Sequence, residues 1–171
     1  LRALGRLRRS RIGLVGVPSD WLVASVPAAE AVREVWGPET VNVDLASLLE
    51  APLREPDDKA LALAASFTDG ASATREAEAA GVRQASTVFS ALSDLMARER
   101  LDAVAVRCFD LVTGRGTSGC LALSALNDAG CVAACLGDLA SAAGMLWVTV
   151  LLGTPSWIAN PSHADAATGL L

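Results

Sequence analysis

The segment Thr113–Gly119 has the residue types best suited to hold an anion or the hydroxyl groups of a sugar. It contains Gly114, Gly116 and Gly119 around Arg115, and it directly precedes a segment with helical spacing. Backbone N–H groups at the start of a helix, together with a guanidinium, form an anion-binding arrangement. The segment lacks the Lys of a phosphate-binding loop, which argues against ATP chemistry. The alternative is an exposed loop that binds no ligand.

Two tryptophans, Trp21 and Trp157, lie near the predicted ends of strands, where an indole could stack against a sugar ring. Ordinary packing explains these positions equally well. Asp138 directly precedes the apolar run Leu139–Leu152, which favours a helix N-cap that accepts hydrogen bonds from free N–H groups. His163 is the single histidine, and its place after the last predicted strand indicates an exposed loop residue.

The four cysteines do not follow a zinc-binding pattern. Cys108, Cys120, Cys131 and Cys135 include no Cys-x-x-Cys pair, and a single histidine leaves too few ligands of the Cys/His kind. We therefore expect buried, reduced thiols in a cytoplasmic protein.

Apolar runs typical of buried strands alternate with helical patterns along the chain. The predicted strands are Arg11–Val17, Thr40–Leu45, Leu101–Arg107, Cys131–Cys135 and Ser156–Asn160, and the main predicted helices are Ala28–Trp36, Val82–Arg100, Cys120–Asp128 and Leu139–Leu152. This alternation predicts a single three-layer α/β domain with a mainly parallel five-stranded sheet and helices on both faces. Ligands of such sheets bind beyond the carboxyl ends of the strands. That rule points to Pro18–Trp21, Cys108–Gly119, Leu136–Asp138 and Asn160–His163.

The charge and hydropathy patterns argue against two classes of partner. With 14 basic and 19 acidic residues and 4% aromatic residues, the chain lacks the basic, aromatic surface that nucleic-acid binding requires. Within the apolar run Cys131–Ala159, the longest uninterrupted stretch is Leu139–Leu152, shorter than the roughly 20 residues of a membrane span. We expect neither a nucleic-acid partner nor a membrane.

Both ends of the chain read as cut from a longer protein. The first residues are rich in arginine and predict a solvated helical linker or the end of a preceding domain, and Leu170-Leu171 reads as the start of another element. The expected organisation is a linker over 1–10, an α/β domain over 11–165 and the beginning of a missing C-terminal segment over 166–171.

Two stretches of this sequence resemble a known enzyme family. One stretch is AVRCFDL at Ala105–Leu111, followed by TSGCLALSALNDAGCVAACLGDL and WIANPS; the other is RIGLVGVPSDWLVAS at Arg11–Ser25. They are similar to the central α/β domain of L-fucose isomerase-like and L-arabinose isomerase-like sugar ketol-isomerases. The resemblance runs from about Arg11 to Asp165. It implies a three-domain subunit, a 6-deoxyhexose or pentose substrate, homo-oligomers with sites between subunits, and aldose–ketose exchange. The chemistry uses Mn²⁺ to polarise the substrate oxygens and carboxylates to move a proton.

Carried onto this sequence, the family pattern leaves one plausible acidic position. Asp110 is the candidate catalytic carboxylate and the only candidate metal ligand. The family pattern Cys-Glu-Gly-Asp reads Cys-Leu-Gly-Asp at 135–138, so Leu136 replaces the expected Glu. At the fifth predicted strand, Asn160 stands where fucose isomerases have an Asp ligand. The candidate substrate-binding residues are Trp21, Arg115, Asp138 and Asn160.

Three hypotheses follow. The chain is the central domain of a carbohydrate isomerase and is inactive as a fragment, or it is a catalytically inactive relative retained for sugar binding or subunit assembly. In the third hypothesis an isomerase-like enzyme has changed its reaction and its metal requirement. Leu136 favours the second, because loss of the carboxylate removes the chemistry without disturbing the fold.

Overall fold

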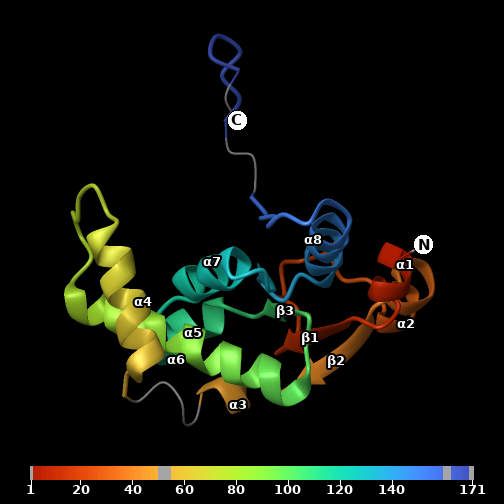
Figure 1. The fold of residues 1–171 in the computed structure, drawn as a ribbon, viewed down its shortest axis with the longest axis horizontal. Helices are drawn as coiled ribbons and strands as arrows, with labels where there is room; N and C mark the ends of the chain where they lie inside the picture. The colour runs from red at the N-terminus through yellow and green to blue at the C-terminus, as the bar shows by residue number, and fades with distance from the viewer. Residues whose placement is uncertain (1, 50–54, 160–162, 170–171) are drawn as a thin grey trace.

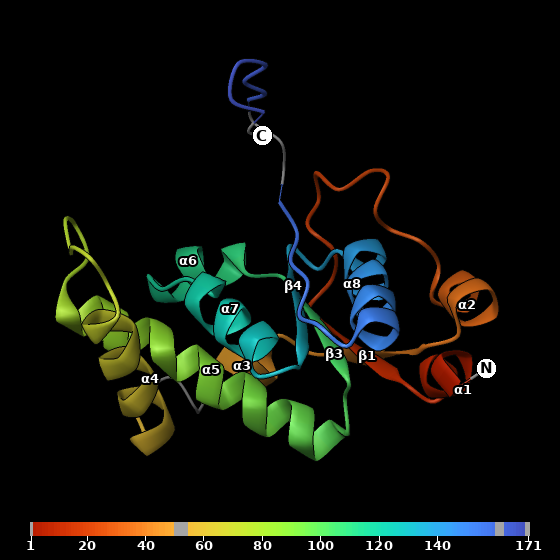
Figure 2. The same cartoon turned by 45° about the horizontal axis from the view of Figure 1, so that its top comes forward.

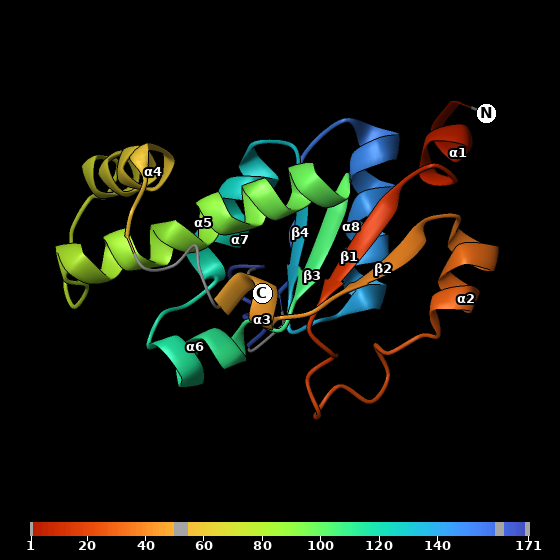
Figure 3. The same ribbon diagram turned by 90° about the horizontal axis from the view of Figure 1, so that it is seen from below.

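Four parallel strands form the centre of the computed structural model, which describes residues 2–49, 55–159 and 163–169. The strands are β1 (Arg11–Val15), β2 (Glu39–Val43), β3 (Ala103–Val106) and β4 (Val132–Cys135), arranged in the order β2-β1-β3-β4 (Figure 3). All three strand pairs are parallel. The mixed α/β class with a parallel sheet is therefore confirmed, whereas the predicted number of five strands is wrong.

Helices connect the strands and cover the sheet (Figure 1). They are α1 (Arg2–Leu7), α2 (Ala29–Ala31) with the π-helical turn η1 (Val32–Trp36), α3 (Ala46–Leu49), α4 (Asp58–Asp69), α5 (Ala79–Glu99), α6 (Phe109–Arg115), α7 (Cys120–Asp128) and α8 (Leu139–Leu152). The structure confirms the predicted bounds of α7 and α8, because capping residues and glycines mark their ends in the sequence.

The sheet has an apolar core on each face. On one face, Val104 and Val106 of β3 pack with residues of α5 and α7 such as Leu92 and Leu123. On the other, Ala103 and Ala105 pack with residues of α1, η1 and α8. Alternate residues of a strand point to opposite faces, so a strand buried on both faces is apolar throughout. Small alanines on the second face leave room for α8 to lie close to the sheet.

The N-terminal segment belongs to this core. Helix α1 contacts α8, and the Leu7 side chain at its end is fully buried. Residues 1–10 were expected to be an arginine-rich helical linker or the end of a preceding domain; residues 2–7 form α1, which packs on this domain. The prediction of a solvated segment rested on its arginines, whereas its contact with the core is made by Leu7.

The predicted fifth strand, Ser156–Asn160, is not formed over the part of it that the structure describes, residues 156–159. Residues 156–159 have no strand structure, and Asn160 lies outside the described residues. The chain after α8 passes along the outer side of β4 (Figure 2), and the Ser156 hydroxyl donates to the Met145 carbonyl oxygen at 3.2 Å. Trp157 is 78% exposed, so this segment lacks the burial typical of an inner strand.

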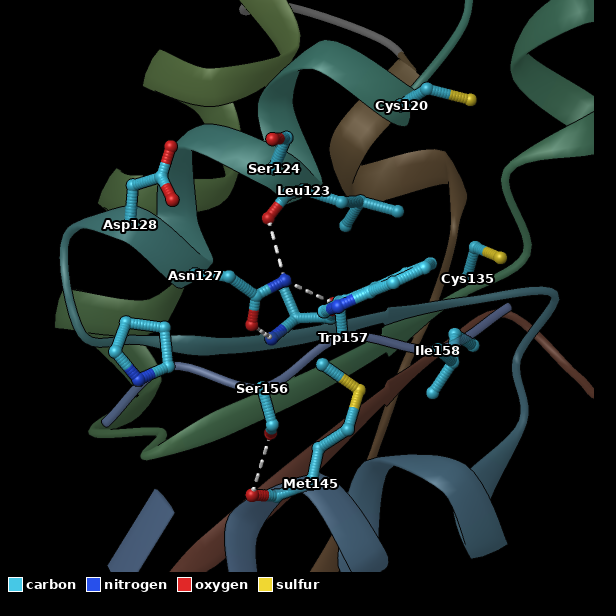
Figure 4. Close-up of a pocket in the computed structure, with 12 residues that line it drawn as sticks. Cys120, Leu123, Ser124, Asn127, Asp128, Cys135, Met145, Ser156, Trp157 and Ile158 are labelled. Atoms are coloured by element: carbon cyan, nitrogen blue, oxygen red, sulfur yellow. Dashed lines mark hydrogen bonds between the residues drawn. The ribbon is translucent and has the colours of Figure 1, made fainter. Parts of the chain in front are cut away.

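The side chain of Asn127 explains why no strand pairs with the middle of β4. Its Oδ1 accepts from the Ala133 N–H at 3.0 Å, and its Nδ2 donates to the Ala133 carbonyl at 2.8 Å and to the Leu123 carbonyl at 2.9 Å (Figure 4). In a parallel sheet both backbone groups of one residue point to the same side. The Asn127 amide thus takes the two hydrogen bonds through which Ala133 would bind a fifth strand.

Candidate functional site

The strand order creates a crevice between the ends of β1 and β3. The chain leaves β1 toward β2 on one side and returns through β3 on the other, so the loops that follow β1 and β3 diverge at this point. Ligands of open parallel sheets bind at such switch points. A cavity of about 530 Å³ lies at the carboxyl ends of β2, β1 and β3, next to this switch point, and its polar lining consists of Asn42, Asp44, Arg107 and Asp110. Figure 3 shows the loop after β1, α3 and α6 gathered at this end of the sheet.

Arg107 organises the crevice. Its Nε donates to Asp110 Oδ1 at 3.0 Å, and its Nη1 donates to the Pro18 carbonyl at 3.0 Å and to Asp20 Oδ1 at 3.2 Å. The Arg107 side chain is 16% exposed, whereas that of Asp20 is 83% exposed. The hydrogen bonds to Asp20 and Asp110 raise the pKa of the guanidinium. Because exposed ion pairs contribute little, we attribute the main positioning role to the contacts with Asp110 and Pro18.

Asp110, the candidate catalytic carboxylate, lies in the first turn of α6 and lines the cavity. One of its oxygens is engaged by Arg107, and its side chain is 40% exposed. The carboxylate is consequently positioned to accept a hydrogen bond from a ligand through its remaining lone pairs.

Trp21 lies beside Phe109, the neighbour of Asp110 in the chain. The two rings meet edge to face with centroids 5.3 Å apart and an interplanar angle of 89°. Both rings are at least half exposed. The structure therefore brings Trp21 to the start of α6, which carries Asp110, and it adds Phe109, which the sequence analysis did not select.

The end of β4 is formed by a tight turn. Leu136 and Gly137 have φ values of 64° and 67°, and the left-handed region is unfavourable for Leu. The Gly137 N–H donates to the Val106 carbonyl at 2.9 Å, and the Leu136 carbonyl accepts from the Ser19 N–H at 3.0 Å. The turn Leu136–Gly137, where a family Glu was expected at position 136, therefore connects the end of β4 to the end of β3 and to the loop after β1 through backbone hydrogen bonds.

The structure confirms Asp138 as the N-cap of α8. Its Oδ1 accepts from the Ser141 N–H at 2.8 Å, its Oδ2 accepts from the Ser141 hydroxyl at 2.7 Å, and the residue is 7% exposed. Both carboxylate oxygens thus face the first turn of α8. A role for Asp138 in substrate binding stays a prediction.

Arg115 is at the opposite end of α6 from Asp110. Five helical residues correspond to about 7.5 Å along the axis, and the Arg115 carbonyl accepts from Gln84 of α5 at 3.2 Å. The predicted loop Thr113–Gly119 is also shorter than expected, because α6 continues through Arg115 and Gly116, with φ 62°, ends it. The first three residues of the expected anion-binding loop, Thr113–Arg115, are therefore helical, and only Gly116–Gly119 remains a loop before α7.

The remaining candidates lie elsewhere. Trp157 lines a second cavity between α7, β4 and α8 (Figure 4). His163 is exposed in the C-terminal segment, as expected for a loop residue. Asn160 is outside the described residues, so its predicted role stays a prediction.

Sequence reasoning missed the pairing of two thiols. Cys108 is the N-cap of α6, just after β3, and Cys135 is the last residue of β4. A hydrogen bond from the Cys135 thiol lowers the pKa of Cys108 to about 6, against the effect of burial. The hydrogen bond to Cys108, followed by burial, raises the pKa of Cys135. A cysteine at the end of each of two predicted strands was the available signal.

The donors at this edge do not fit Mn²⁺. Within residues 2–49, 55–159 and 163–169, no group of three or more His, Cys, Asp or Glu side chains could hold a metal ion. Asp110 is bound by Arg107, Asp138 is bound by Ser141, and Leu136 has no donor atom in its side chain. Manganese prefers several oxygen ligands, which this part of the chain does not bring together.

Comparison with known proteins adds no relative: no protein-family model and no curated protein matches the chain. In the described part of the chain, the helices are too short or too polar to cross a membrane.

Proposed function

We propose that this chain is a sugar isomerase-like α/β domain that binds a neutral, polyhydroxylated small molecule in the crevice between β1 and β3. The observation that carries the proposal is the cavity at the switch point, where Asn42, Asp44, Arg107 and Asp110 converge. Its volume of about 530 Å³ lies within the range of small-ligand pockets, about 300–1,000 Å³.

The chemistry of the lining favours a sugar over an anion. Hydroxyl groups both donate and accept; the Asp44 and Asp110 carboxylates accept, whereas Asn42 offers both a donor and an acceptor. The Arg107 guanidinium is paired with the carboxylates of Asp20 and Asp110, and the cavity also contains the carboxylate of Asp44. This excess of negative charge disfavours a sugar phosphate.

The nearby aromatic rings support the same ligand class. Trp21 and Phe109 leave apolar ring surface exposed next to polar side chains. An aldose or ketose has apolar C–H faces as well as hydroxyl edges, and it matches this combination.

We further propose that this chain does not itself supply the acid–base groups for aldose–ketose exchange. Proton transfer between neighbouring carbons requires a carboxylate near the carbon acid. Leu136 cannot supply one, and the described residues do not form a Mn²⁺ site. On this proposal, the resemblance to sugar isomerases reflects the ancestry of the chain and the class of its ligand. We further propose that the protein is a cytoplasmic homo-oligomer. If the complete protein is an active isomerase, its carboxylates and Mn²⁺ ligands come from other segments or subunits.

Binding is tested by NMR titration of the ¹⁵N-labelled protein with L-fucose, L-arabinose and D-glucose 6-phosphate. We expect shifts at Asn42, Asp44 and Asp110 with the neutral sugars, and weaker shifts with the phosphate. Trp21→Ala should weaken binding about tenfold, from a stacking contribution of about 1–1.5 kcal/mol. Trp157→Ala, a change at an even more exposed tryptophan outside this crevice, should leave binding unchanged. Shifts that cluster around Trp157, or none at all, contradict the proposal.

Catalysis is tested on the full-length protein and on its Leu136→Glu variant, with Mn²⁺ and each sugar. We expect the wild-type protein to show no metal-dependent exchange. Wild-type activity that requires Mn²⁺ would show that the non-catalytic proposal is wrong while leaving the binding proposal intact.

A further inference from the structure

The two edges of the sheet differ in whether their backbone groups are already bound. At the β4 edge, the Asn127 side chain binds the N–H and the carbonyl of Ala133, and the Cys135 carbonyl accepts from the Asp138 N–H at 3.1 Å. An unpaired strand edge can pair with another chain, and proteins commonly block such edges. The β4 edge is thus blocked at Ala133 and at the Cys135 carbonyl.

Two backbone contacts show which residues of β2 face the neighbouring strand β1. β2 is the outermost strand on the opposite side of the sheet from β4 (Figure 3). The Glu39 N–H donates to the Ser10 carbonyl at 2.9 Å, and the Val43 carbonyl accepts from the Gly16 N–H at 2.9 Å. Glu39 and Val43, the first and last residues of β2, therefore face β1.

The outer edge of β2 is open. In a parallel ladder, residues whose N–H and carbonyl both face the neighbouring strand alternate with residues whose groups face away from it. Val41 therefore faces β1, whereas Thr40 and Asn42 face away. In the part of the chain that the structure describes, no group hydrogen-bonds to the backbone N–H or carbonyl of these two residues. Two donors and two acceptors are consequently free at this edge.

These free groups are placed symmetrically about Val41. In an antiparallel pair, opposite residues whose backbone groups point to the partner strand exchange two hydrogen bonds. A second copy that runs antiparallel with Val41 opposite itself would place Thr40 opposite Asn42 twice, and each of these pairs would form two hydrogen bonds. One register thus satisfies the free donors and acceptors of both copies.

The neighbouring symmetric registers satisfy fewer groups. With Thr40 opposite itself, Asn42 would lie opposite Pro38, which has no N–H. With Asn42 opposite itself, Thr40 would lie opposite Asp44, whose carbonyl already accepts from the Ser47 N–H at 3.1 Å and from the Ser47 hydroxyl at 2.7 Å. The sequence around the strand therefore selects one register.

We propose that two copies of this chain form a two-fold symmetric dimer in which their β2 strands pair antiparallel, with Val41 opposite Val41, and join the two sheets into one. This inference rests on the homo-oligomer of the proposed function and assigns it a surface. The two Glu39 side chains would lie four residues, about 14 Å, apart along the strands. This separation exceeds the screening length of about 8–10 Å, so their repulsion is largely screened. Because the contact is confined to a strand of five residues, we expect a small interface and a dimer that dissociates on dilution.

Cross-linking tests the register. Val41 would occupy a non-hydrogen-bonded position, at which opposite Cα atoms are about 4.5 Å apart, within the range of a disulfide. Val41→Cys should therefore form a disulfide-linked dimer under mild oxidation. Val43→Cys is the matched control: Val43 is the same residue type on the same face and is also partly buried, but the two copies of position 43 would lie about 14 Å apart. The tryptic peptide 34–54 contains no native cysteine, so tandem mass spectrometry assigns the link.

Sedimentation velocity tests whether the free backbone groups form the contact. We expect the wild-type protein to shift from monomer toward dimer as its concentration rises to about 1 mM, the dissociation constant of a very weak contact. Thr40→Pro removes one outward-facing N–H from each copy without removing a hydrogen bond to β1, and proline is tolerated on edge strands. It should weaken dimerisation at least about tenfold. Thr40→Val keeps the N–H and the shape of the side chain, and it should dimerise like the wild-type protein.

A wild-type protein that stays monomeric at about 1 mM, equal cross-linking at positions 41 and 43, or unchanged association of Thr40→Pro overturns the proposal. A monomer would also contradict the homo-oligomer and leave the open edge to an extended segment of another protein, whereas a dimer linked elsewhere contradicts only the β2 contact. Sugar binding in the crevice is decided separately by the NMR titration. If Thr40→Pro does not fold by circular dichroism, the comparison of Val41→Cys with Val43→Cys decides.

Discussion

Replacement of Gly137 by alanine tests how tightly the ends of β1 and β4 pack. A Cβ at this position would lie 3.0 Å from the Pro18 Cα and 3.0 Å from the Val17 carbonyl oxygen, and both are backbone atoms that cannot rotate away. The φ value of 67° adds a second cost, because the left-handed region is unfavourable for residues with a Cβ by about 1–2 kcal/mol. Overpacking against backbone costs about 1–3 kcal/mol more.

The expected loss for Gly137→Ala is therefore about 2–5 kcal/mol in the free energy of unfolding, a large part of the roughly 5–15 kcal/mol of a typical domain. Gly153→Ala is the matched control. Gly153 has a similar φ of 70° at the end of α8, but a Cβ there would meet no atom within 4 Å. It should lose only the conformational part, about 1–2 kcal/mol.

Urea denaturation of both variants measures the difference. The two losses should differ by at least about 1 kcal/mol, with unchanged m-values. Equal losses would refute the inference that Gly137 is required by close approach as well as by backbone conformation. The contact of Val17 and Pro18 with this turn, and the support it gives to Arg107, would then need another explanation.

Three further predictions concern the edge of β4, the cap of α8 and the buried thiol. Asn127→Ala leaves the Ala133 N–H and carbonyl without their side-chain partner and should lower the free energy of unfolding, measured by urea denaturation, by about 1–3 kcal/mol. It should also promote concentration-dependent association in size-exclusion chromatography, because an open strand edge can pair with another chain. Asp138→Ala should lose about 1–2 kcal/mol of the free energy of unfolding, whereas Asp138→Asn, which keeps an acceptor for the Ser141 N–H, should lose less; equal losses would show that the cap is not the main contribution. In the folded protein, thiolate absorbance of Cys108 should appear as pH rises through about 6, below its ordinary value of 9.0. The lowered pKa of Cys108 stabilises the fold increasingly as pH rises from about 6 toward 9 and loses this contribution as pH falls through 6, whereas the raised pKa of Cys135 opposes it above 9; Cys108→Ser should remove the absorbance step near 6, and a Cys108-dependent step near 9 instead would contradict the prediction.

The sequence by itself determined the elements with strong local signals. Four strands and most helices follow from apolar runs and helical spacing, and Asp138 predicted its own cap because capping depends on neighbours within one turn. The parallel sheet with helices on both faces follows from strands that are apolar on both sides. The sequence also placed Trp21 and Asp110 at strand ends, and the structure brings their segments together.

Only the tertiary structure decided which of these residues meet. Local sequence patterns do not determine the order of the strands in the sheet. The tertiary structure was therefore needed to identify the switch point between β1 and β3, the role of Arg107 and the interaction of Cys108 with Cys135. The predicted fifth strand had the composition of a strand, but Asn127 occupies the edge groups that would pair with it. The composition of a segment indicates whether it could form a strand. Whether it joins the sheet depends on which backbone N–H and carbonyl groups remain free on the edge strand next to it.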